Sequence, residues 1–572
     1  MTTAHARGPI LPMAMRLFLI LILSLNFLGC TRKHELGNTL RVAVREKFKT
    51  LDPIDAQDYY SNVLLTRSYE TLLAYHYLKR PYELTPMLAE SMPKISKDGL
   101  FYTFHLKKGV YFQPDDAFGP ESKKQGHGRE MVAADVVYSL KRLADPHLAS
   151  SGWWILDQKV KGLNAWRDEA AKASSTNYAA AVEGLVARDN YTFELRLAKP
   201  YPLILNLLAI PYASVVAQEV VAKYGAEFRQ HPVGTGPFRL ESLSSNQAVW
   251  KKFEHFHGQA YPSDGAPGDR EAGLLADAGK PLPFVDRLID DIIIEDQPAW
   301  LNFMQFNHDY LMKVPKDNAV AVFDAEGKPQ KALVEKNVNV HVVPATDFTY
   351  YAFNYEDPVV GGEKNRFLRQ AMSMAYDEAP AIEKFYLGLA RKAESPIPPT
   401  VQGYDASFKN ASREYNLVKA REILAKAGHA GGQGIPEITL ETRSSSTERQ
   451  QAEYFQRKMQ ELGLKIKLVP YSWPELLVRI KKKQAQLWSI SWLLDYPDAE
   501  NSLQLLYGPN ESPGTNSANY KNAKWDAFYE KMSILPNGPA RHKIIGEMQQ
   551  IFAHDVPWII AVHRAETRLS HE

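Results

Sequence analysis

Apolar residues at every second position predict β-strands in several parts of the chain. Residues 40–44, 102–106 and 191–197 share this alternation, which is typical of a strand with one buried face. The strand over 102–106 is followed by Lys107-Lys108-Gly109 and by an apolar stretch at 110–112. Because a short glycine-containing segment separates the two stretches, we predict a hairpin here.

Helical spacing appears between the predicted strands. Apolar residues three and four positions apart over 136–143 predict a helix. Farther along, a strand at 438–440, a helix over 448–462 that ends at Gly463, and a strand at 465–468 predict a β-α-β unit. The mixture of strands and helices indicates an α/β protein.

The middle of the chain contains an unusual segment. Residues 257–283 include five glycines and four prolines with few periodic apolar positions, which predicts a long surface loop. Beyond the loop, residues 292–294 predict a buried strand and residues 300–306 predict a helix.

The N-terminus carries an apolar run of 13 residues, 17–29, preceded by Arg7 and Arg16. A membrane-spanning helix needs about 20 such residues, whereas this length suits the hydrophobic part of a secretory signal. Cys30, the one cysteine of the chain, follows directly. This order resembles a lipoprotein signal, so we expect a signal peptide at 1–29, a lipidated Cys30, and a polar tether over 30–38.

Composition narrows the class of protein. The chain has 572 residues, enough for more than one hydrophobic core. It has 68 Lys and Arg against 66 Asp and Glu, so it lacks the basic footprint of a nucleic-acid binder. A single cysteine excludes a disulfide scaffold and a cysteine-based zinc or iron–sulfur site.

Motifs for catalysis are missing from the sequence. There is no nucleophile elbow, P-loop, zinc-binding H-E-x-x-H or dinucleotide-binding glycine pattern. His255 and His257 could chelate a metal, but no nearby carboxylate pair completes a site, so we favour a solvated loop. We expect no enzyme activity, no metal and no cofactor.

Short motifs in a fixed order give the chain a family resemblance. They extend over nearly all of the mature chain: Leu51-Asp52-Pro53, Tyr69-Glu70-Thr71-Leu72, Leu88-Ala89-Glu90-Ser91, Asp98-Gly99, Ala134-Asp135-Val136-Val137, Gly234-Thr235-Gly236-Pro237-Phe238, Phe353-Asn354, Arg369-Gln370-Ala371, Tyr376-Asp377, Trp492 to Pro497, and Asn519-Tyr520. In this order they resemble the family 5 extracellular solute-binding proteins, the oligopeptide- and dipeptide-binding class of ABC importers.

The resemblance implies a two-lobed periplasmic-binding-protein fold with an extra inserted domain and the ligand in the interlobe cleft. Lobe I would comprise 36–85, 215–347 and 536–572. The inserted domain II would take 86–214, and lobe III 348–535.

The same resemblance implies the ligand site. In peptide-binding members, the aspartate of the W-x-x-D-Y segment pairs with the ligand's α-ammonium, and that position is Asp495 here. A closed cleft has a low dielectric constant, so a buried ammonium needs a carboxylate partner. The alternative is a structural loop aspartate. The extended ligand backbone would lie against Gln57 to Tyr59 and pair with Ile490, Ser491 and Trp492, contacts that suit mixed peptide sequences.

Two positions bear on how the ligand's carboxylate would be held. Some oligopeptide binders place an arginine six positions before the aspartate, where Ser489 stands here. Dipeptide binders place an arginine after the strand that matches 438–440, and Arg443 lies close to that position. Arg443 could therefore hold a carboxylate with two hydrogen bonds, or it could simply be a solvent-exposed arginine.

The resemblance implies a monomer, lipid-anchored in the periplasm or cell envelope, that captures peptides and delivers them to the permease subunits of an ABC transporter. One alternative is the same fold with a metal chelate, haem or sugar as ligand. The other is an envelope hydrolase.

Overall fold

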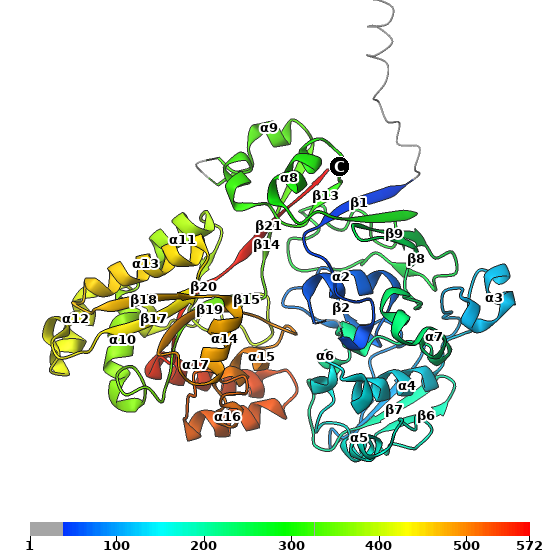
Figure 1. Cartoon of the computed structure of the whole chain (residues 1–572), viewed down its shortest axis with the longest axis horizontal. Helices are drawn as coiled ribbons and strands as arrows, with labels where there is room; N and C mark the ends of the chain where they lie inside the picture. Colours follow the sequence, from blue (N-terminus) through cyan, green and yellow to red (C-terminus); the bar gives the residue numbers. More distant parts are fainter. Residues whose placement is uncertain (1–37, 56, 325–326, 572) are drawn as a thin grey trace, which may run out of the picture.

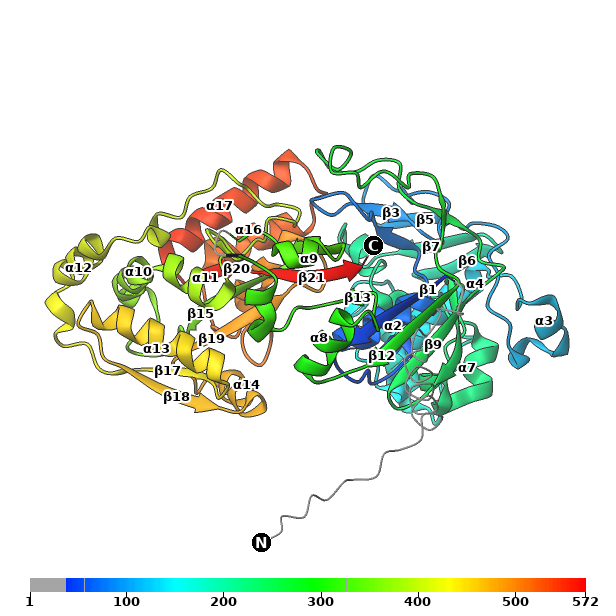
Figure 2. The same cartoon turned by 90° about the horizontal axis from the view of Figure 1, so that it is seen from above.

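The computed structural model describes residues 38–55, 57–324 and 327–571. Three β-sheets organise this part of the chain, and Figures 1 and 2 show them in two halves that lie side by side. We keep the names lobe I, domain II and lobe III for the units built around the seven-stranded, four-stranded and six-stranded sheets.

Lobe I is built on the seven-stranded sheet, in which β1 pairs in parallel with β12. In order across the sheet, its strands are β14 (Val338–Pro344), β21 (Ala565–His571), β13 (Tyr310–Leu311), β1 (Thr39–Val44), β12 (Arg287–Ile292), β9 (Gln247–Lys252) and β8 (Phe238–Leu243). Its helices are α2 (Tyr59–Ser68), α7 (Gln218–Tyr224), α8 (Asp296–Met304) and α9 (Lys331–Val334), and it carries the hairpin of β2 (Leu73–Tyr75) and β3 (Leu84–Pro86).

Domain II is inserted into lobe I and shares a continuous apolar core with it. Its sheet contains β4 (Lys94–Ile95), β5 (Phe101–His105), β7 (Thr192–Arg196) and β6 (Leu185–Asp189), and its helices are α3 (Pro120–Gln125), α4 (Ala133–Ala144), α5 (Leu163–Lys172) and α6 (Ile204–Leu207). Because the two units bury one core, they form a single half of the molecule (Figure 1).

Lobe III surrounds the six-stranded sheet. Across this sheet the strands are β16 (Arg391–Lys392), β20 (Trp558–His563), β15 (Asp347–Phe353), β19 (Leu487–Leu493), β17 (Ile438–Arg443) and β18 (Ile466–Tyr471). Its helices are α10 (Arg366–Ala375), α11 (Glu378–Tyr386), α12 (Leu417–Lys426), α13 (Ser446–Gln460), α14 (Trp473–Lys481), α15 (Ala499–Leu503), α16 (Ala523–Ser533) and α17 (Pro539–Asp555). All seven residues of β15 are buried, so this strand is the centre of the lobe.

Several expectations from the sequence are confirmed. The strands at 40–44 and 191–197 correspond to β1 and β7, and the helix at 136–143 lies within α4. The predicted β-α-β unit is β17-α13-β18, with its two strands parallel. Segment 257–283 is mostly turns, apart from the short pair β10 (Gln259–Ala260) and β11 (Pro281–Leu282).

Other expectations are wrong. No hairpin forms after β5, because β5 pairs with β4 and β7 while residues 110–112 bond to residues 128–131. Alternation identifies a strand but not its partner. The strand expected at 292–294 is β12, which already ends at Ile292, and Ile294 is 53% exposed.

The strand pairing also corrects the C-terminal domain boundary. Residues 536–572 were assigned to lobe I, but α17 packs against α16 and β20 pairs with β15, so both lie in lobe III. Only β21 returns to the sheet of lobe I. The chain therefore crosses between the halves at residues 344–347 and again at residues 563–565.

A buried ion pair joins lobe I to domain II. Asp52 accepts two hydrogen bonds from Arg142 of α4, at 2.6 Å to Nη1 and 2.7 Å to Nη2. Both residues are less than 5% exposed. Loss of one partner would leave a desolvated charge without compensation.

We therefore expect Asp52→Asn to lower the free energy of unfolding by about 3 kcal/mol or more, since breaking a buried pair typically costs that amount. Urea unfolding measures the effect. The matched control is Glu169→Gln, which removes an exposed pair with Lys172 and should leave the free energy of unfolding nearly unchanged, because water screens the pair. Equal effects of the two substitutions would contradict the structural role of Asp52.

Candidate functional site

Strand β19 carries three of the residues predicted to contact a ligand. It pairs antiparallel with β15, so that Ile490 lies opposite Tyr350, Ser491 opposite Thr349, and Trp492 opposite Phe348. Ser491 and Thr349 share a hydrogen bond of 2.8 Å between their hydroxyl groups. Because β15 is buried along its whole length, β19 is held rigidly at the edge of the cleft.

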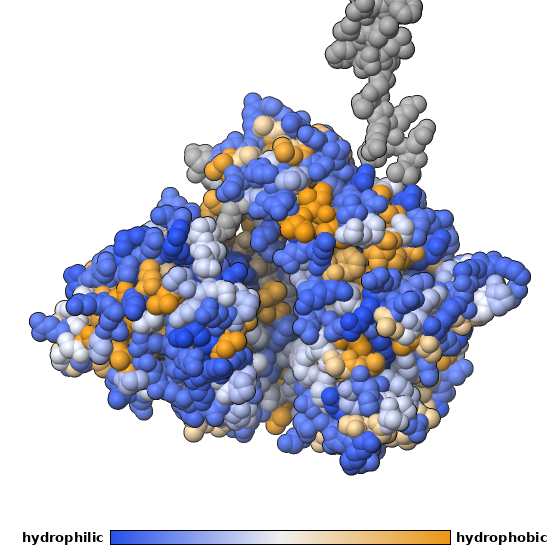
Figure 3. All heavy atoms as spheres, viewed as in Figure 1, coloured by the Kyte–Doolittle hydropathy of each residue, from blue (hydrophilic) through white to orange (hydrophobic). Residues whose placement is uncertain are grey.

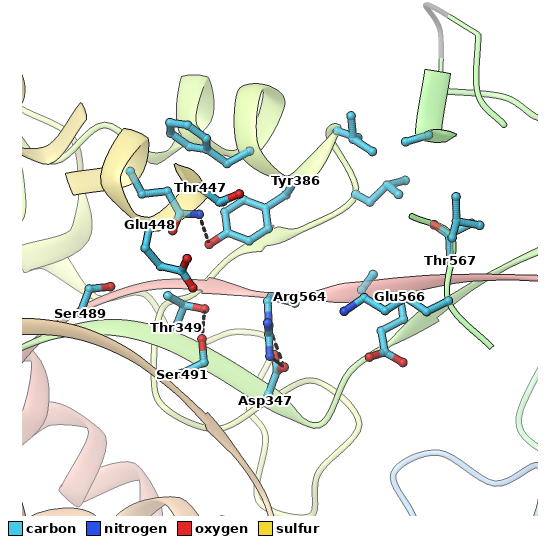
Figure 4. Close-up of a pocket in the computed structure, with 18 of the residues that line it drawn as sticks. Asp347, Thr349, Tyr386, Thr447, Glu448, Ser489, Ser491, Arg564, Glu566 and Thr567 are labelled. Carbon is cyan, nitrogen blue, oxygen red and sulfur yellow. Dashed lines mark hydrogen bonds and ion pairs between the residues drawn. The ribbon is translucent and has the colours of Figure 1, made fainter. Parts of the chain in front are cut away.

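A cavity of about 380 Å³ lies between the two halves of the molecule. Figure 4 shows its side chains and Figure 3 shows the molecule hollowed between its halves. Lobe I and the second crossing contribute Lys313, Val314, Ala319, Arg564, Ala565, Glu566 and Thr567. Lobe III and the first crossing contribute Asp347, Thr349, Phe385, Tyr386, Leu387, Leu389, Arg443, Thr447, Glu448, Gln451, Trp473, Ser489, Ile490 and Ser491.

Charged groups of both signs line this cavity. Arg564 donates to Asp347, with Nε 2.8 Å from Oδ2, and so ties together the two crossings between the lobes. Arg443 is 3.4 Å from Glu448 and lies 5.2 Å from the centroid of the Trp473 ring. With a half-exposed side chain, the Arg443 guanidinium remains accessible to a ligand carboxylate, which it could hold through two hydrogen bonds.

Tyr386 forms the inner wall beside the hydroxyl pair. Its OH accepts a 3.1 Å hydrogen bond from Nε2 of Gln451 on α13 (Figure 4). Desolvation by burial raises the pKa of Tyr386. The phenol is therefore neutral at physiological pH and offers both a donor and an acceptor.

Asp495 lies two residues beyond the end of β19, and Asn501 of α15 positions it. Asn501 is fully buried; its Oδ1 accepts from the Asp495 backbone N–H at 3.2 Å and from Trp492 Nε1 at 3.0 Å. The Asn501 amide donates to Asp495 Oδ2 at 3.2 Å. One side chain thus fixes both the aspartate and the tryptophan of the W-x-x-D segment.

The carboxylate of Asp495 reaches solvent in the cleft, yet desolvation by the surrounding protein raises its pKa. The hydrogen bond from Asn501 acts in the opposite direction and is the smaller effect. Burial raises the pKa of Tyr212 in the other half, and the charge of Asp495 adds a smaller contribution in the same direction. A cationic group bound beside a partly desolvated carboxylate would stabilise its charged form, so Asp495 is suited to bind such a group.

The predicted site residues fall into four groups, of which the last, Gln57 and Tyr59, lies in lobe I. Arg443, Ile490 and Ser491 line the cavity. Trp492 and Asp495 lie farther along the same strand and loop, outside the cavity lining. Cys30 lies outside the described residues.

Gln57 and Tyr59 are exposed at the start of α2 and do not line the cavity. Tyr59 is nevertheless close enough to Glu566, a lining residue, for that charge to contribute to its raised pKa, although desolvation is the main cause. The roles of both residues in ligand binding stay predictions.

Sequence reasoning missed Asn501, Tyr386 and the pair Asp347–Arg564. Asn501 is six positions after Asp495, and a polar residue in a helix directly after an aspartate motif could have been noticed. Of the other three, Arg564 is more than a hundred residues from both Asp347 and Tyr386, and only the folded structure brings them together.

The described ranges contain no cluster of three His, Cys, Asp or Glu residues that could hold a metal ion. The two loop histidines have other partners. His257 is buried, with Nε2 3.0 Å from both carboxylate oxygens of Glu70, and the ring of His255 lies 4.8 Å from that of His127. The expectation that His257 is solvated is therefore wrong. In the same ranges, no helix is both long and apolar enough to cross a bilayer.

Residues 83–514 match the bacterial extracellular solute-binding proteins, family 5 Middle. The chain belongs to this family. Haem-binding protein A of Haemophilus influenzae is 26% identical over 94% of this chain and 87% of its own. The glutathione-binding protein GsiB of Escherichia coli is 25% identical over 91% of this chain and 87% of its own.

Among solved structures, the periplasmic binding protein DppA of Helicobacter pylori, in complex with the peptide STSA, is similar to this family 5 chain. The TM-score is 0.66 at 22% identity, with 94% of each chain covered. The likeness confirms the fold class, an α/β protein of two lobes with a cleft between them. One of the two relatives is named for binding haem and the other for binding glutathione, so family membership alone does not identify the ligand.

The raised pKa of Asp495 has a consequence for stability. The pKa of Asp495 is higher in the folded state than in the unfolded state. At pH 7 the ionised carboxylate therefore lowers the stability of the folded state. This destabilisation becomes smaller as the pH falls through the folded-state pKa and the carboxylate is protonated. We expect Asp495→Asn to match or exceed the wild-type free energy of unfolding at pH 7, by at most about 1 kcal/mol because solvent reaches the group. The difference should shrink at pH 4. Urea unfolding at both pH values measures it, and a loss of stability at pH 7 would indicate a structural aspartate.

Proposed function

We propose that this protein captures peptides in the interlobe cleft and delivers them to the permease of an ABC importer. The observation that carries the proposal is the arrangement along β19. Asp495 offers a partly desolvated carboxylate beyond the C-terminal end of the strand. Arg443, at the end of the parallel strand β17 and level with Ile490, offers a half-exposed guanidinium in the cavity. An extended peptide carries the complementary charges at its two termini.

The strand between these groups suits a ligand of variable sequence. Ile490, Ser491 and Trp492 belong to β19, which can offer backbone groups to an extended chain. Contacts to the ligand backbone do not depend on which side chains the ligand carries. The surrounding cavity contains polar groups of several kinds, including Tyr386 and the Ser491–Thr349 pair, which can adapt to different side chains.

Closure of the cleft would follow from the two crossings between the lobes. Since residues of both halves line the cavity, a peptide bound there would stabilise the closed arrangement over the open one. Closure also removes water from Asp495, and a cation then becomes the partner that compensates its charge. Binding requires no bond to be broken, and the protein would act as a carrier and not as an enzyme.

Haem is the second candidate, because one relative is named for haem binding. The residues that line the cavity include no histidine, cysteine or methionine, and Tyr386 is the lining side chain able to ligate iron. Tyr386 already accepts from Gln451. Peptide therefore fits the lining better than haem.

The anchor and location complete the proposal. Cys30 would be lipidated after removal of residues 1–29 and would hold the protein at the cell-envelope membrane that faces the periplasm. Two or three acyl chains are needed for a stable anchor, because one chain binds reversibly. The monomeric state, the peptide ligand and the permease partner belong to the same proposal.

Asp495→Asn should weaken binding of a peptide with a free N-terminus by at least about a hundredfold, because removing one partner of a buried charge pair costs ~3–5 kcal/mol. An N-acetylated peptide lacks the ammonium, so it should bind wild type poorly and be affected far less. Calorimetry on both proteins with both peptides completes the double-mutant cycle. The matched control is Asp405→Asn, an exposed aspartate of lobe III that bonds Ser407. Simple addition of the two losses would show that Asp495 does not meet the ammonium.

Cys30→Ala should release the protein into the soluble envelope fraction, because the acylated thiol is the proposed attachment. Fractionation followed by immunoblotting measures the distribution. Thermal unfolding of the released protein should match that of wild type, because the described hydrophobic cores are built from residues 43–569. A variant that stays membrane-bound as firmly as wild type would refute the anchor.

A further inference from the structure

The loop at 257–283 is fastened to lobe I by polar contacts. At its start, His257 and Gln259 both bond the buried carboxylate of Glu70, at 3.0 Å and 3.3 Å. At its neck, β10 pairs with β11, and Tyr261 N–H donates to the Lys280 carbonyl at 2.8 Å. Contacts at both ends of a glycine-rich segment keep it in one place, so the loop presents a defined surface.

That surface is apolar and aromatic. The Tyr261 ring lies between Tyr77 and Phe284, with centroid distances of 5.8 Å and 6.0 Å. Tyr77 is 65% exposed, Phe284 42% and Leu274 47%. The Tyr261 OH donates to the Leu274 carbonyl at 2.8 Å, which places the leucine beside the rings. We call Tyr77, Tyr261, Leu274 and Phe284 the aromatic platform.

The platform lies where the described chain begins. The side-chain amide of Asn38 donates to the Phe284 carbonyl, and the Asn38 carbonyl accepts from Asp286 N–H at 2.7 Å. Cys30 precedes Asn38 by eight residues. Even a fully extended segment of that length spans at most about 28 Å, so a lipid on Cys30 would keep the platform close to the membrane surface.

Part of the charge near the platform is paired with acids, whereas Arg80 and Lys252 bond the backbone carbonyls of Tyr77 and Pro283 at 3.2 Å and 3.4 Å. Lys79 pairs with Asp264 and Glu83, at 2.9 Å and 3.3 Å, and Lys280 pairs with Asp277. Attraction to anionic lipid needs a cluster of uncompensated basic residues. Contact with a membrane at this surface would therefore depend on the apolar rings and leucine.

We propose that the aromatic platform docks onto the headgroup region of the bilayer that holds the anchor. This inference rests on the proposed lipidation of Cys30. Tyrosine and other aromatic rings favour the membrane–water interface, because an apolar body and a polar edge match the two environments. Docking would orient lobe I and domain II toward the membrane and leave lobe III to move against them.

The sole cysteine allows a direct test. The mature chain from Cys30 onward is coupled through that thiol to a maleimide lipid in phosphatidylcholine vesicles, so that attachment does not depend on cellular lipidation. Phe284→Trp places a fluorescent reporter in the platform and keeps an aromatic ring there. The control reporter is Tyr404→Trp in lobe III, where the native ring is 38% exposed. The fluorescence of the ten native tryptophans is subtracted with the parent protein.

With brominated acyl chains in the vesicles, we expect at least about twofold greater quenching of the platform reporter than of the control. Adding Tyr77→Ser and Leu274→Ser to the Phe284→Trp protein should reduce this quenching, while its peptide affinity by calorimetry stays unchanged. Replacing a third of the lipid by phosphatidylglycerol should change the result little, because two basic side chains that bond carbonyls do not make the basic cluster that anionic lipid attracts.

Equal quenching of both reporters, or no quenching of either, would overturn the docking proposal. The platform would then be better explained as a binding surface for a protein or a glycan. A strong increase with anionic lipid would overturn it as well, since attraction by charge would then replace apolar contact. Because the thiol coupling supplies the attachment, these outcomes do not depend on the Cys30→Ala experiment. That experiment alone tests natural lipidation.

Discussion

The two halves of the described chain are joined by only two crossings, at residues 344–347 and 563–565, and the rest of the structure depends on them. The crossings lie side by side: Ala345 N–H donates to the Arg564 carbonyl at 3.0 Å, and the Arg564 guanidinium binds Asp347. Both charged residues also line the cavity. A ligand that contacts the cavity therefore acts directly on the element about which the lobes can move.

Motion between the halves is possible because each half is internally rigid. Lobe I and domain II share one core and the buried Asp52–Arg142 pair, while lobe III packs helices on both faces of its sheet (Figure 1). The halves also touch away from the crossings, where Tyr82 N–H donates to the Thr400 carbonyl at 3.2 Å and Gln402 Nε2 donates to the Tyr82 carbonyl at 3.1 Å. Tyr496 of lobe III is also buried in the core cluster of lobe I and domain II, so separation of the halves would have to withdraw this ring as well as break the hydrogen bonds.

The sequence could predict elements whose partners are close along the chain. The β17-α13-β18 unit is complete within residues 438–471, so the spacing of apolar residues in this segment was enough to predict it. The expected hairpin after β5 failed, because the real partners of β5 include β7, about ninety residues later. The prediction that all of segment 536–572 belongs to lobe I was wrong for the same reason, because the consecutive strands β20 and β21 join different sheets. Strand pairing between distant segments depends on the whole fold, which no local pattern contains.

The candidate site could likewise be predicted only in part, and Asp495 is an example. A motif can identify an aspartate, but only the structure reveals that desolvation raises its pKa and that Asn501 is the group fixing it. Among the described residues, no cation is a cause of the shift. A structural aspartate would be expected to have its charge compensated within the fold, as Asp347 has from Arg564. Asp495, in contrast, is exposed, so water solvates its charge in this structure, and a ligand ammonium could take the place of that water when the cleft closes. The proposed role of Asp495 in ligand binding therefore rests on this exposure and on the absence of a protein cation from the causes of its pKa shift.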